Sequence, residues 1–252
     1  MLKLSNFSSF FVANWKLNGN LQFIDQFITN ISLPNTNSKC VVICPTAIYL
    51  DYLSKYKNGF YVGAQNVSEH EEGAYTGEIS VRSLVETNVN FCIVGHSERR
   101  QIFKEKDQDI NLKSERLIAN NVIPIICIGE TLEQKEKGIT NTVLEEQLMN
   151  SIPSSSTFEN TIIAYEPVWA IGTGEAASPF DAQSMHEMIR KEIAKHSNES
   201  EALKFRVLYG GSMNEINCKS FLEMTDIDGG LVGGASLKPE SFFKMKTLAS
   251  EL

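Results

Sequence analysis

The sequence lacks any long hydrophobic run. No apolar stretch among its 252 residues approaches the roughly 18 residues that a membrane-spanning helix requires. Residues 1–10 carry a single lysine and are interrupted by serine and asparagine, so they have neither the apolar centre of a signal peptide nor the arginine content of a transit peptide. We therefore expect a cytoplasmic protein that does not interact with membranes.

Cysteine and histidine are sparse, and neither is spaced for a disulfide framework or a metal centre. The cysteines are five, an odd number, and none belongs to a Cys-x-x-Cys pair. Two lie inside apolar runs, which predicts reduced, buried thiols. The four histidines show no ligand spacing, so we expect no structural zinc.

Positive charge is in the minority. The 23 lysine and arginine residues face 31 aspartate and glutamate residues, which gives a formal net charge of −8. The basic residues are scattered along the chain, and this argues against nucleic acid as a partner. An anionic small molecule stays possible if a local site overcomes the overall repulsion.

Short β-rich runs recur along the chain, and each ends in glycine, proline or a polar residue. Most are continuously apolar, as expected of parallel strands that are covered on both faces. They lie at residues 10–13, 41–44, 61–64, 91–94, 125–128, 161–165, 205–209 and 230–232.

Amphipathic segments of helical length lie between these runs. Ser178 and Pro179 open one of them with an N-cap residue and a proline in the first turn. Within it Met185, Ile189 and Ile193 repeat at four-residue spacing, which predicts one buried stripe.

Two other helices are expected near the middle and the end of the chain. One is a long charged helix that begins at Ser97 and ends near Asn120. The last begins at Pro239 and places Phe242 and Met245 on one side.

Eight strand–helix units in about 250 residues predict an α/β fold, a single (β/α)8 barrel that occupies residues 1–252 as one domain. No linker or change in composition marks an internal boundary. The alternative is an open, doubly wound sheet, but no Gly-x-Gly-x-x-Gly follows the first strand.

Catalytic groups of such barrels lie at the C-terminal ends of the strands. Asn14 and Lys16 follow the first run, where a fixed ammonium can face an anionic ligand, although a lone lysine can equally be a solvated loop charge. His96 and Glu98 follow the fourth run at a helix start. That position favours a neutral imidazole that donates a hydrogen bond, or simply a capping histidine and a glutamate that complements the helix dipole.

Glu166 ends the sixth run, and Pro167 keeps it out of a helix. The following residues 168–174 are apolar and contain glycine, where an ordinary loop would be polar. They are better explained as a lid that buries its apolar side on closing. The alternative for Glu166 is a solvated surface carboxylate.

Two glycine turns, at residues 210–211 and 233–234, follow the last two predicted strands. Each can be a plain tight turn. Together with Ser212 they also fit backbone N–H groups that hold a phosphate.

Taken together, these tips resemble the triosephosphate isomerase family over almost the whole chain. The most specific motif is Ala-Tyr-Glu-Pro-Val-Trp-Ala-Ile-Gly-Thr-Gly at residues 164–174. The other matches, in the family's order, lie at residues 14–16, 95–100, 209–212 and 231–236.

The resemblance implies interconversion of dihydroxyacetone phosphate and glyceraldehyde 3-phosphate through an enediolate, without cofactor or metal. It implies that Glu166 is the base, that neutral His96 polarises the carbonyl, and that Lys16 and Asn14 stabilise negative charge while Glu98 holds the geometry from behind. The phosphate is then bound near Gly172, Ser212, Gly233 and Gly234 beneath the lid at 167–177.

Residues 73–78, Gly-Ala-Tyr-Thr-Gly-Glu, resemble the loop that family members insert into a second subunit. The resemblance implies a homodimer in which Thr76 packs near Asn14 and Lys16 of the partner subunit. The alternative is a flexible surface loop with a glycine turn.

A few positions depart from the family pattern. Ala13 and Met213 do so away from the chemistry, whereas Glu175 stands in the lid, where many members have lysine. The rates of lid opening and product release are therefore the family properties that we least expect this chain to share. Two other functions are weighed against the isomerase: an enzyme that acts on a different sugar phosphate, and a barrel kept only for protein interaction.

Overall fold

The computed structural model describes residues 2–29, 38–56, 59–171 and 176–250. Its eight strands are all parallel and close into a barrel in the order β1 to β8, with β8 pairing back to β1. This confirms the predicted (β/α)8 barrel. The strands are β1 Ser9–Asn14, β2 Lys39–Cys44, β3 Tyr61–Ala64, β4 Phe91–Val94, β5 Ile123–Ile128, β6 Ile162–Tyr165, β7 Arg206–Tyr209 and β8 Gly229–Val232.

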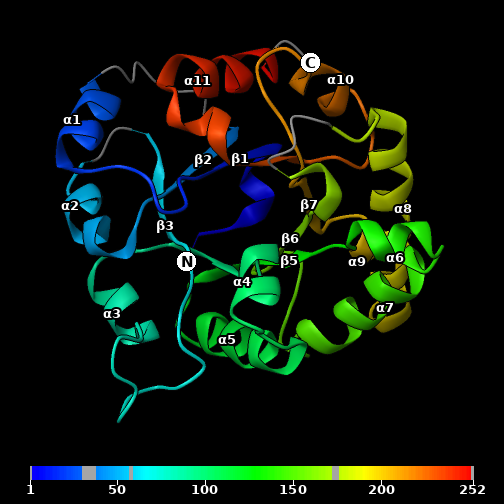
Figure 1. Ribbon diagram of the computed structural model, residues 1–252, viewed down its shortest axis with the longest axis horizontal. Coiled ribbons are helices and arrows are strands. Elements are labelled where there is room, and N and C mark those ends of the chain that lie inside the picture. Colours follow the sequence, from blue (N-terminus) through cyan, green and yellow to red (C-terminus); the bar gives the residue numbers. More distant parts are fainter. Residues whose placement is uncertain (1, 30–37, 57–58, 172–175, 251–252) are drawn as a thin grey trace.

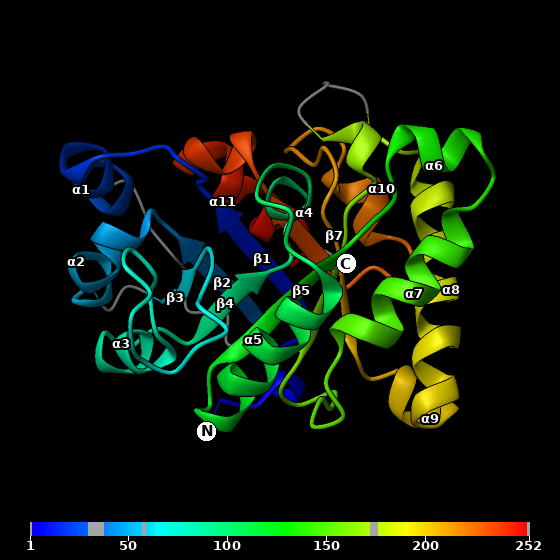
Figure 2. The same cartoon turned by 60° about the horizontal axis from the view of Figure 1, so that its bottom comes forward.

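Helices surround the strands, as Figures 1 and 2 show from two directions. The α-helices are α1 Leu21–Thr29, α2 Leu50–Ser54, α3 Val81–Glu86, α4 Ser97–Ile102, α5 Asp107–Ala119, α6 Leu132–Glu136, α7 Thr140–Ser151, α8 Pro179–His196, α9 Glu199–Ala202, α10 Cys218–Leu222 and α11 Pro239–Leu248. The 3-10 turns of the described ranges are η1 Leu4–Asn6, η2 Ala47–Tyr49, η3 Val168–Ala170 and η4 Gly234–Leu237. None of the helices in the described ranges is both long and apolar enough to cross a bilayer.

The strands are apolar throughout because both of their faces are buried. In β1, Phe10 and Val12 belong to a cluster built almost entirely from strand residues, which fills the barrel. Phe11 and Ala13 point the other way and join a second cluster with helix side chains. Since side chains alternate across a strand, an uninterrupted apolar run supplies both clusters.

Helix α8 begins as the sequence predicts. The Ser178 hydroxyl accepts a hydrogen bond from the Asp181 N–H at 3.0 Å, and Pro179 occupies the first turn. Ile189 and Ile193 of the predicted stripe are buried in the core, and Met185 is partly buried against the same cluster. The predicted last helix is confirmed as α11, where Phe242 and Met245 are fully buried.

The long helix expected from Ser97 to Asn120 is wrong, because it is two helices. The chain leaves α4 at Phe103, and Lys104 adopts a left-handed backbone with φ of 60° that no helix continues. Helix α5 then restarts where the Asp109 carboxylate accepts from the Lys106 N–H at 3.0 Å. Ion pairs from α4 hold the break, with Arg99 binding Glu105 and Arg100 binding Asp107.

All five cysteines are free thiols, and all are buried. Desolvation raises the pKa of Cys40 and of Cys92, both inside or against the barrel. The reduced, buried state predicted from the sequence is confirmed.

His186 on α8 is a buried titratable side chain that lies away from the strand tips. Its Nδ1 lies 3.1 Å from the Asp226 carbonyl oxygen, while its Nε2 is buried without a hydrogen-bond partner in the described part of the chain. Burial lowers the pKa of His186 to about 4, against about 6.5 for histidine in an unfolded chain. Between these values the unfolded state binds more protons, so the folded state loses stability as the pH falls.

We expect this histidine to cost about 2 kcal/mol of unfolding free energy between pH 7 and pH 5, at 1.36 kcal/mol per pKa unit. His186→Asn keeps an N–H donor near the Asp226 carbonyl and removes the titration. Urea unfolding of both proteins at both pH values, at one protein concentration, measures the difference. Equal losses of stability in the two proteins would show that His186 carries no such penalty.

Candidate active site

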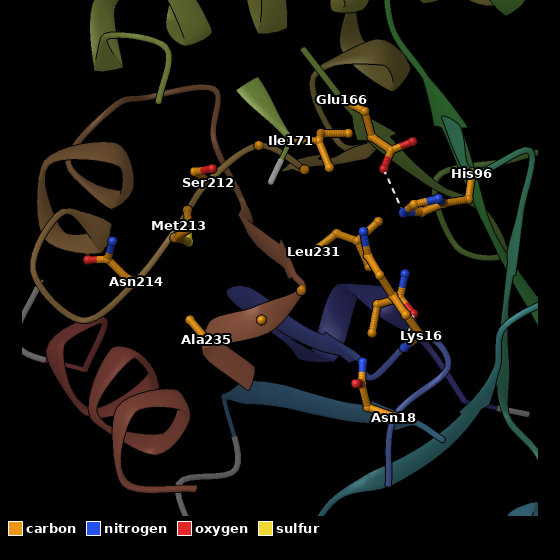
Figure 3. Close-up of a pocket in the computed structure, with 15 residues that line it drawn as sticks. Lys16, Asn18, His96, Glu166, Ile171, Ser212, Met213, Asn214, Leu231 and Ala235 are labelled. Carbon is orange, nitrogen blue, oxygen red and sulfur yellow. Dashed lines mark hydrogen bonds and ion pairs between the residues drawn. The ribbon is translucent and has the colours of Figure 1, made fainter. Parts of the chain in front are cut away.

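A cavity of about 390 Å³ opens where the strands end (Figure 3). It brings together side chains that follow β1, β4, β6, β7 and β8. Seven of the residues predicted from the sequence line it, namely Asn14, Lys16, His96, Glu166, Ser212, Gly233 and Gly234. Gly172 lies outside the described residues, as does Glu175.

Glu166 stands directly after β6, and its side chain is 2% exposed. Its Oε1 is 3.0 Å from His96 Nε2, and its Oε2 accepts from the Ser97 N–H at 2.8 Å. In Figure 3 the carboxylate and the ring face each other. Burial raises the pKa of Glu166, but His96 and the Ser97 N–H lower it by more, so this buried carboxylate is ionised at neutral pH.

A glycine makes room for this carboxylate. Gly210 follows β7, and a Cβ atom placed there would lie 2.8 Å from Glu166 Cγ and 3.0 Å from the Tyr165 carbonyl oxygen. Any other residue would displace Glu166 or the end of β6. The glycine turn at 210–211 is therefore required by packing against the site.

His96 precedes α4 and caps it. Its Nδ1 accepts a hydrogen bond from the Glu98 N–H at 3.2 Å. A ring nitrogen that accepts carries no proton, so the hydrogen lies on Nε2, the atom that faces Glu166. Burial and the charge of Lys16 lower the pKa of His96, while the Glu166 carboxylate raises it by more. The hydrogen bond from the Glu98 N–H to Nδ1 also favours the neutral ring.

Lys16 is held in a strained backbone conformation just beyond β1. Its φ is 52°, in the left-handed region that non-glycine residues rarely adopt. The Lys16 N–H donates to Asn14 Oδ1 at 3.1 Å, and the Lys16 carbonyl accepts from Gln65 Nε2 at 2.8 Å. These two bonds fix the loop and direct the side chain.

Glu98 connects the lysine to the histidine. Its Oε1 lies 2.6 Å from Lys16 Nζ, and its Oε2 lies 3.7 Å from His96 Nδ1. It lies outside the cavity lining and contacts two residues that line it.

The turns after β7 and β8 form the other side of the cavity. The Ser212 hydroxyl donates to the Ala170 carbonyl at 2.7 Å, which links this turn to η3. Gly233 precedes η4 and Gly234 begins it, and the Ser236 hydroxyl donates to the Gly233 carbonyl at 2.6 Å. Lys16 reaches this turn, since a Cβ atom at Gly233 would lie 3.5 Å from Lys16 Cε.

Glu130 is a functional candidate to which the sequence analysis assigned no role. It follows β5 and is 2% exposed, and it accepts from Trp169 Nε1 at 2.8 Å and from the Tyr165 hydroxyl at 3.2 Å. Burial raises the pKa of Glu130, although these two donors lower it. Its signal in the sequence is a carboxylate that follows an apolar strand after a single glycine.

The other end of the segment that follows β6 is also anchored. The Ala177 N–H donates to the Tyr209 hydroxyl at 3.1 Å. The hydrogen bond from Trp169 to Glu130 therefore anchors the start of this segment, and the hydrogen bond from Ala177 to Tyr209 of β7 anchors its end. Over the described ranges, no group of three or more His, Cys, Asp or Glu side chains could hold a metal ion.

Comparison with known proteins gives one family. A family model described as triosephosphate isomerase matches residues 9–249. The triosephosphate isomerase of Colwellia psychrerythraea is 46% identical over 239 residues, covering 91% of this chain and 93% of that protein. Those of Zygosaccharomyces bailii and Saccharomyces cerevisiae are 47% and 45% identical over 236 residues, each alignment covering 92% of this chain and 95% of the relative. With a matching model over most of its length and relatives this similar, the chain belongs to the triosephosphate isomerase family.

Proposed function

We propose that the cavity interconverts dihydroxyacetone phosphate and D-glyceraldehyde 3-phosphate, the reaction of the family in glycolysis and gluconeogenesis. One observation carries the proposal: Lys16, His96 and Glu166 converge on a single cavity, with Glu166 buried and ionised 3.0 Å from His96. An enzyme for a different sugar phosphate would be expected to have other strand-tip residues. A barrel kept only for protein interaction has no need of a buried carboxylate.

Glu166 is the proposed base that moves a proton between the two carbon atoms of the substrate. In the arrangement described here it is occupied by His96 and the Ser97 N–H, so it exchanges these bonds for the substrate carbon. A carboxylate away from bulk water is a stronger base than one in water, because desolvation disfavours its charge. General acid–base catalysis of this kind contributes about 10²–10⁴-fold, or about 3–5 kcal/mol of barrier.

His96 is the proposed donor to the carbonyl oxygen. Its Nδ1 is committed to the Glu98 N–H, which leaves Nε2–H to donate to a substrate oxygen once Glu166 turns away. That movement also removes the carboxylate that raises the pKa of His96. Both effects favour the neutral ring that the sequence predicted.

Lys16 and Asn14 are the proposed partners of the developing oxyanion. The ammonium supplies positive charge inside a protein whose net charge is −8, so the local site offsets the overall repulsion of an anionic substrate. Its strained, doubly hydrogen-bonded backbone fixes the position of the charge before substrate arrives, which is the condition for electrostatic stabilisation. Glu98 is proposed to hold Lys16 through its carboxylate and His96 through its backbone N–H.

The phosphate is proposed to bind to backbone N–H groups near Ser212, Gly233 and Gly234, across the cavity from Glu166, together with Gly172 of the lid at 167–177. Small residues there let a ligand approach the backbone closely. Lid closure excludes water from the enediolate and so prevents its loss of phosphate. No cofactor or metal is needed for these steps.

We also propose that the chain works as a homodimer in the cytoplasm, with residues 1–252 as one domain. The loop at 73–78 projects from the body of the barrel below α3 in Figure 1, and its residues are exposed. Tyr75 stacks on His70 with ring centroids 3.7 Å apart, and just before the loop Arg116 Nη1 lies 2.6 Å from Glu71 Oε1, so contacts within the chain support the loop. In the proposed dimer a second copy covers Leu17 and Ile48, which are 91% and 79% exposed in the single chain.

Thr76→Arg tests this interface. In the proposed dimer Thr76 packs near Asn14 and Lys16 of the partner subunit, so an arginine would bring like charge against Lys16. We expect the dimer dissociation constant to rise about 100-fold, a cost of roughly 3 kcal/mol. Sedimentation equilibrium measures this, with Thr142→Arg on the exposed face of α7 as control. A Thr76→Arg protein that dimerises like the control would exclude this loop from the interface.

The function itself is tested by assaying the purified chain with D-glyceraldehyde 3-phosphate in the presence of a chelator. Conversion to dihydroxyacetone phosphate is the expected result. An inactive protein that is folded and dimeric would return both alternative functions to consideration.

A further inference from the structure

The charged end of Lys135 lies against the face of Trp169. Lys135 belongs to α6, and its Nζ is 3.3 Å from the centroid of the Trp169 ring. Trp169 lies in η3, and its Nε1 donates to Glu130 at 2.8 Å. The indole is therefore held at two places, its N–H edge by a carboxylate and its face by an ammonium.

Lys135 is placed by a rigid turn. Helix α6 begins two residues after Glu130, and Thr131 caps it: the Thr131 hydroxyl accepts from the Gln134 N–H at 3.3 Å, and Gln134 Oε1 accepts from the Thr131 N–H at 2.8 Å. The Lys135 N–H then donates to the Thr131 carbonyl at 3.0 Å. This reciprocal cap fixes the start of the Lys135 side chain one turn beyond Glu130.

The electrostatics of the three groups favour the same arrangement. Glu130 is a carboxylate that is 2% exposed, and such a charge is tolerated only with hydrogen bonds and a nearby cation. The positive charge of Lys135 acts on Glu130 as well as on the ring face. Trp169 thus lies between a fixed anion and a fixed cation, and leaving this place gives up both interactions.

The position of Trp169 governs its neighbours in the site. Three residues before it is Glu166, and one residue after it Ala170 accepts from the Ser212 hydroxyl at 2.7 Å. Val168 N–H also donates to the Glu130 carbonyl at 3.1 Å. An interaction that fixes the indole of Trp169 therefore also fixes the segment that joins Glu166 to the turn at Ser212.

We propose that Lys135 is a positioning residue: acting through Trp169, it stabilises the arrangement of residues 167–171 seen here relative to the one that closes on substrate. Lys135 has this role in catalysis only if the function proposed above holds, because Trp169 belongs to the lid at 167–177. The contact itself, however, exists without substrate and can be measured in the free protein.

Lys135→Met removes the charge and keeps most of the side chain's length. A cation–π contact at an exposed site favours one arrangement about two- to fivefold. Without this contact, the arrangement of residues 167–171 in the free protein is less stable, so less of the substrate's binding energy is used to change it. We therefore expect the KM for glyceraldehyde 3-phosphate to fall two- to fivefold while kcat changes less. The separate variant Lys135→Arg keeps a cation over the ring, so its KM should equal that of the unmodified protein.

The free protein gives a second readout. The chain has two tryptophans, and Trp15 is fully buried, so acrylamide quenching of tryptophan emission reports mainly on Trp169. Lys135→Met should increase the quenching, and Lys135→Arg should not. Lys137→Met, an equal loss of charge two residues along that removes only an exposed pair with Glu133, is the matched control.

Three results would overturn the proposal: unchanged quenching and KM in Lys135→Met, the same changes in Lys137→Met, or no restoration by Lys135→Arg. A protein without isomerase activity would instead contradict the proposed function, while quenching would still report whether Lys135 holds Trp169.

Discussion

Replacing Glu166 with glutamine is expected to lower kcat by about 10²–10⁴-fold, with a smaller change in KM. The amide has nearly the same shape as the carboxylate but cannot accept the proton from carbon. The cavity should persist, because its walls are strand tips that do not depend on the charge of this group. The loss therefore measures the base and not the fold.

The hydrogen bonds around Glu166 sharpen this expectation. The carboxylate accepts from both the Ser97 N–H and His96 Nε2. A glutamine oxygen can accept from one of these donors, and its NH₂ group then faces the other. We expect Glu166→Gln to cost some stability as well, because one buried donor loses its acceptor.

Exchange of the substrate's carbon-bound hydrogen with D₂O, followed by NMR, separates the two effects. If Glu166 is the base, exchange and turnover disappear together in Glu166→Gln. Glu86→Gln is the control, since Glu86 is an exposed carboxylate that pairs with Arg82 on α3. A Glu166→Gln protein that keeps a tenth or more of the wild-type kcat, with exchange intact, would assign the base to another group.

Much of the site could be predicted from the sequence because parallel strands of a barrel end at one rim. Once the apolar runs are placed, the residues that follow them must be neighbours, however far apart they lie in the chain. Lys16, His96 and Glu166 were found in this way, and their convergence needs no knowledge of side-chain geometry. The strands agree to within two residues because burial on both faces leaves a simple apolar signature.

Other features depend on contacts between elements and left no such signature. The break between α4 and α5 depends on the backbone of Lys104 and on ion pairs from Arg99 and Arg100, which no local pattern of charged residues distinguishes from a continuous helix. Glu130 acquires its importance only from Trp169, which reaches it from the segment after the next strand. Tertiary hydrogen bonds decide such positions, whereas helix and strand patterns do not.

Replacing Lys16 with methionine is expected to lower kcat/KM by about 10²–10³-fold, the usual effect of removing one preorganised group from an oxyanion site. Methionine has nearly the length of lysine, and it is strained as much as lysine by the positive φ of this position, so the substitution removes the charge alone. Steady-state kinetics with glyceraldehyde 3-phosphate measure the loss. Lys55→Met, which removes an exposed ammonium paired with Asp51 on α2, controls for net charge.

Part of that loss should come from Glu98 and not from the missing ammonium. In the intact site Glu98 Oε1 is 2.6 Å from Lys16 Nζ, so Lys16→Met leaves a carboxylate unpaired beside a cavity that must receive a phosphate. Adding Glu98→Gln removes this charge. If the double variant recovers activity relative to Lys16→Met, the recovered part measures repulsion of the substrate, and the remainder measures stabilisation of the oxyanion by Lys16. A Lys16→Met protein within tenfold of the wild type would show instead that the backbone N–H groups and His96 are sufficient, and that Lys16 serves the fold of its loop.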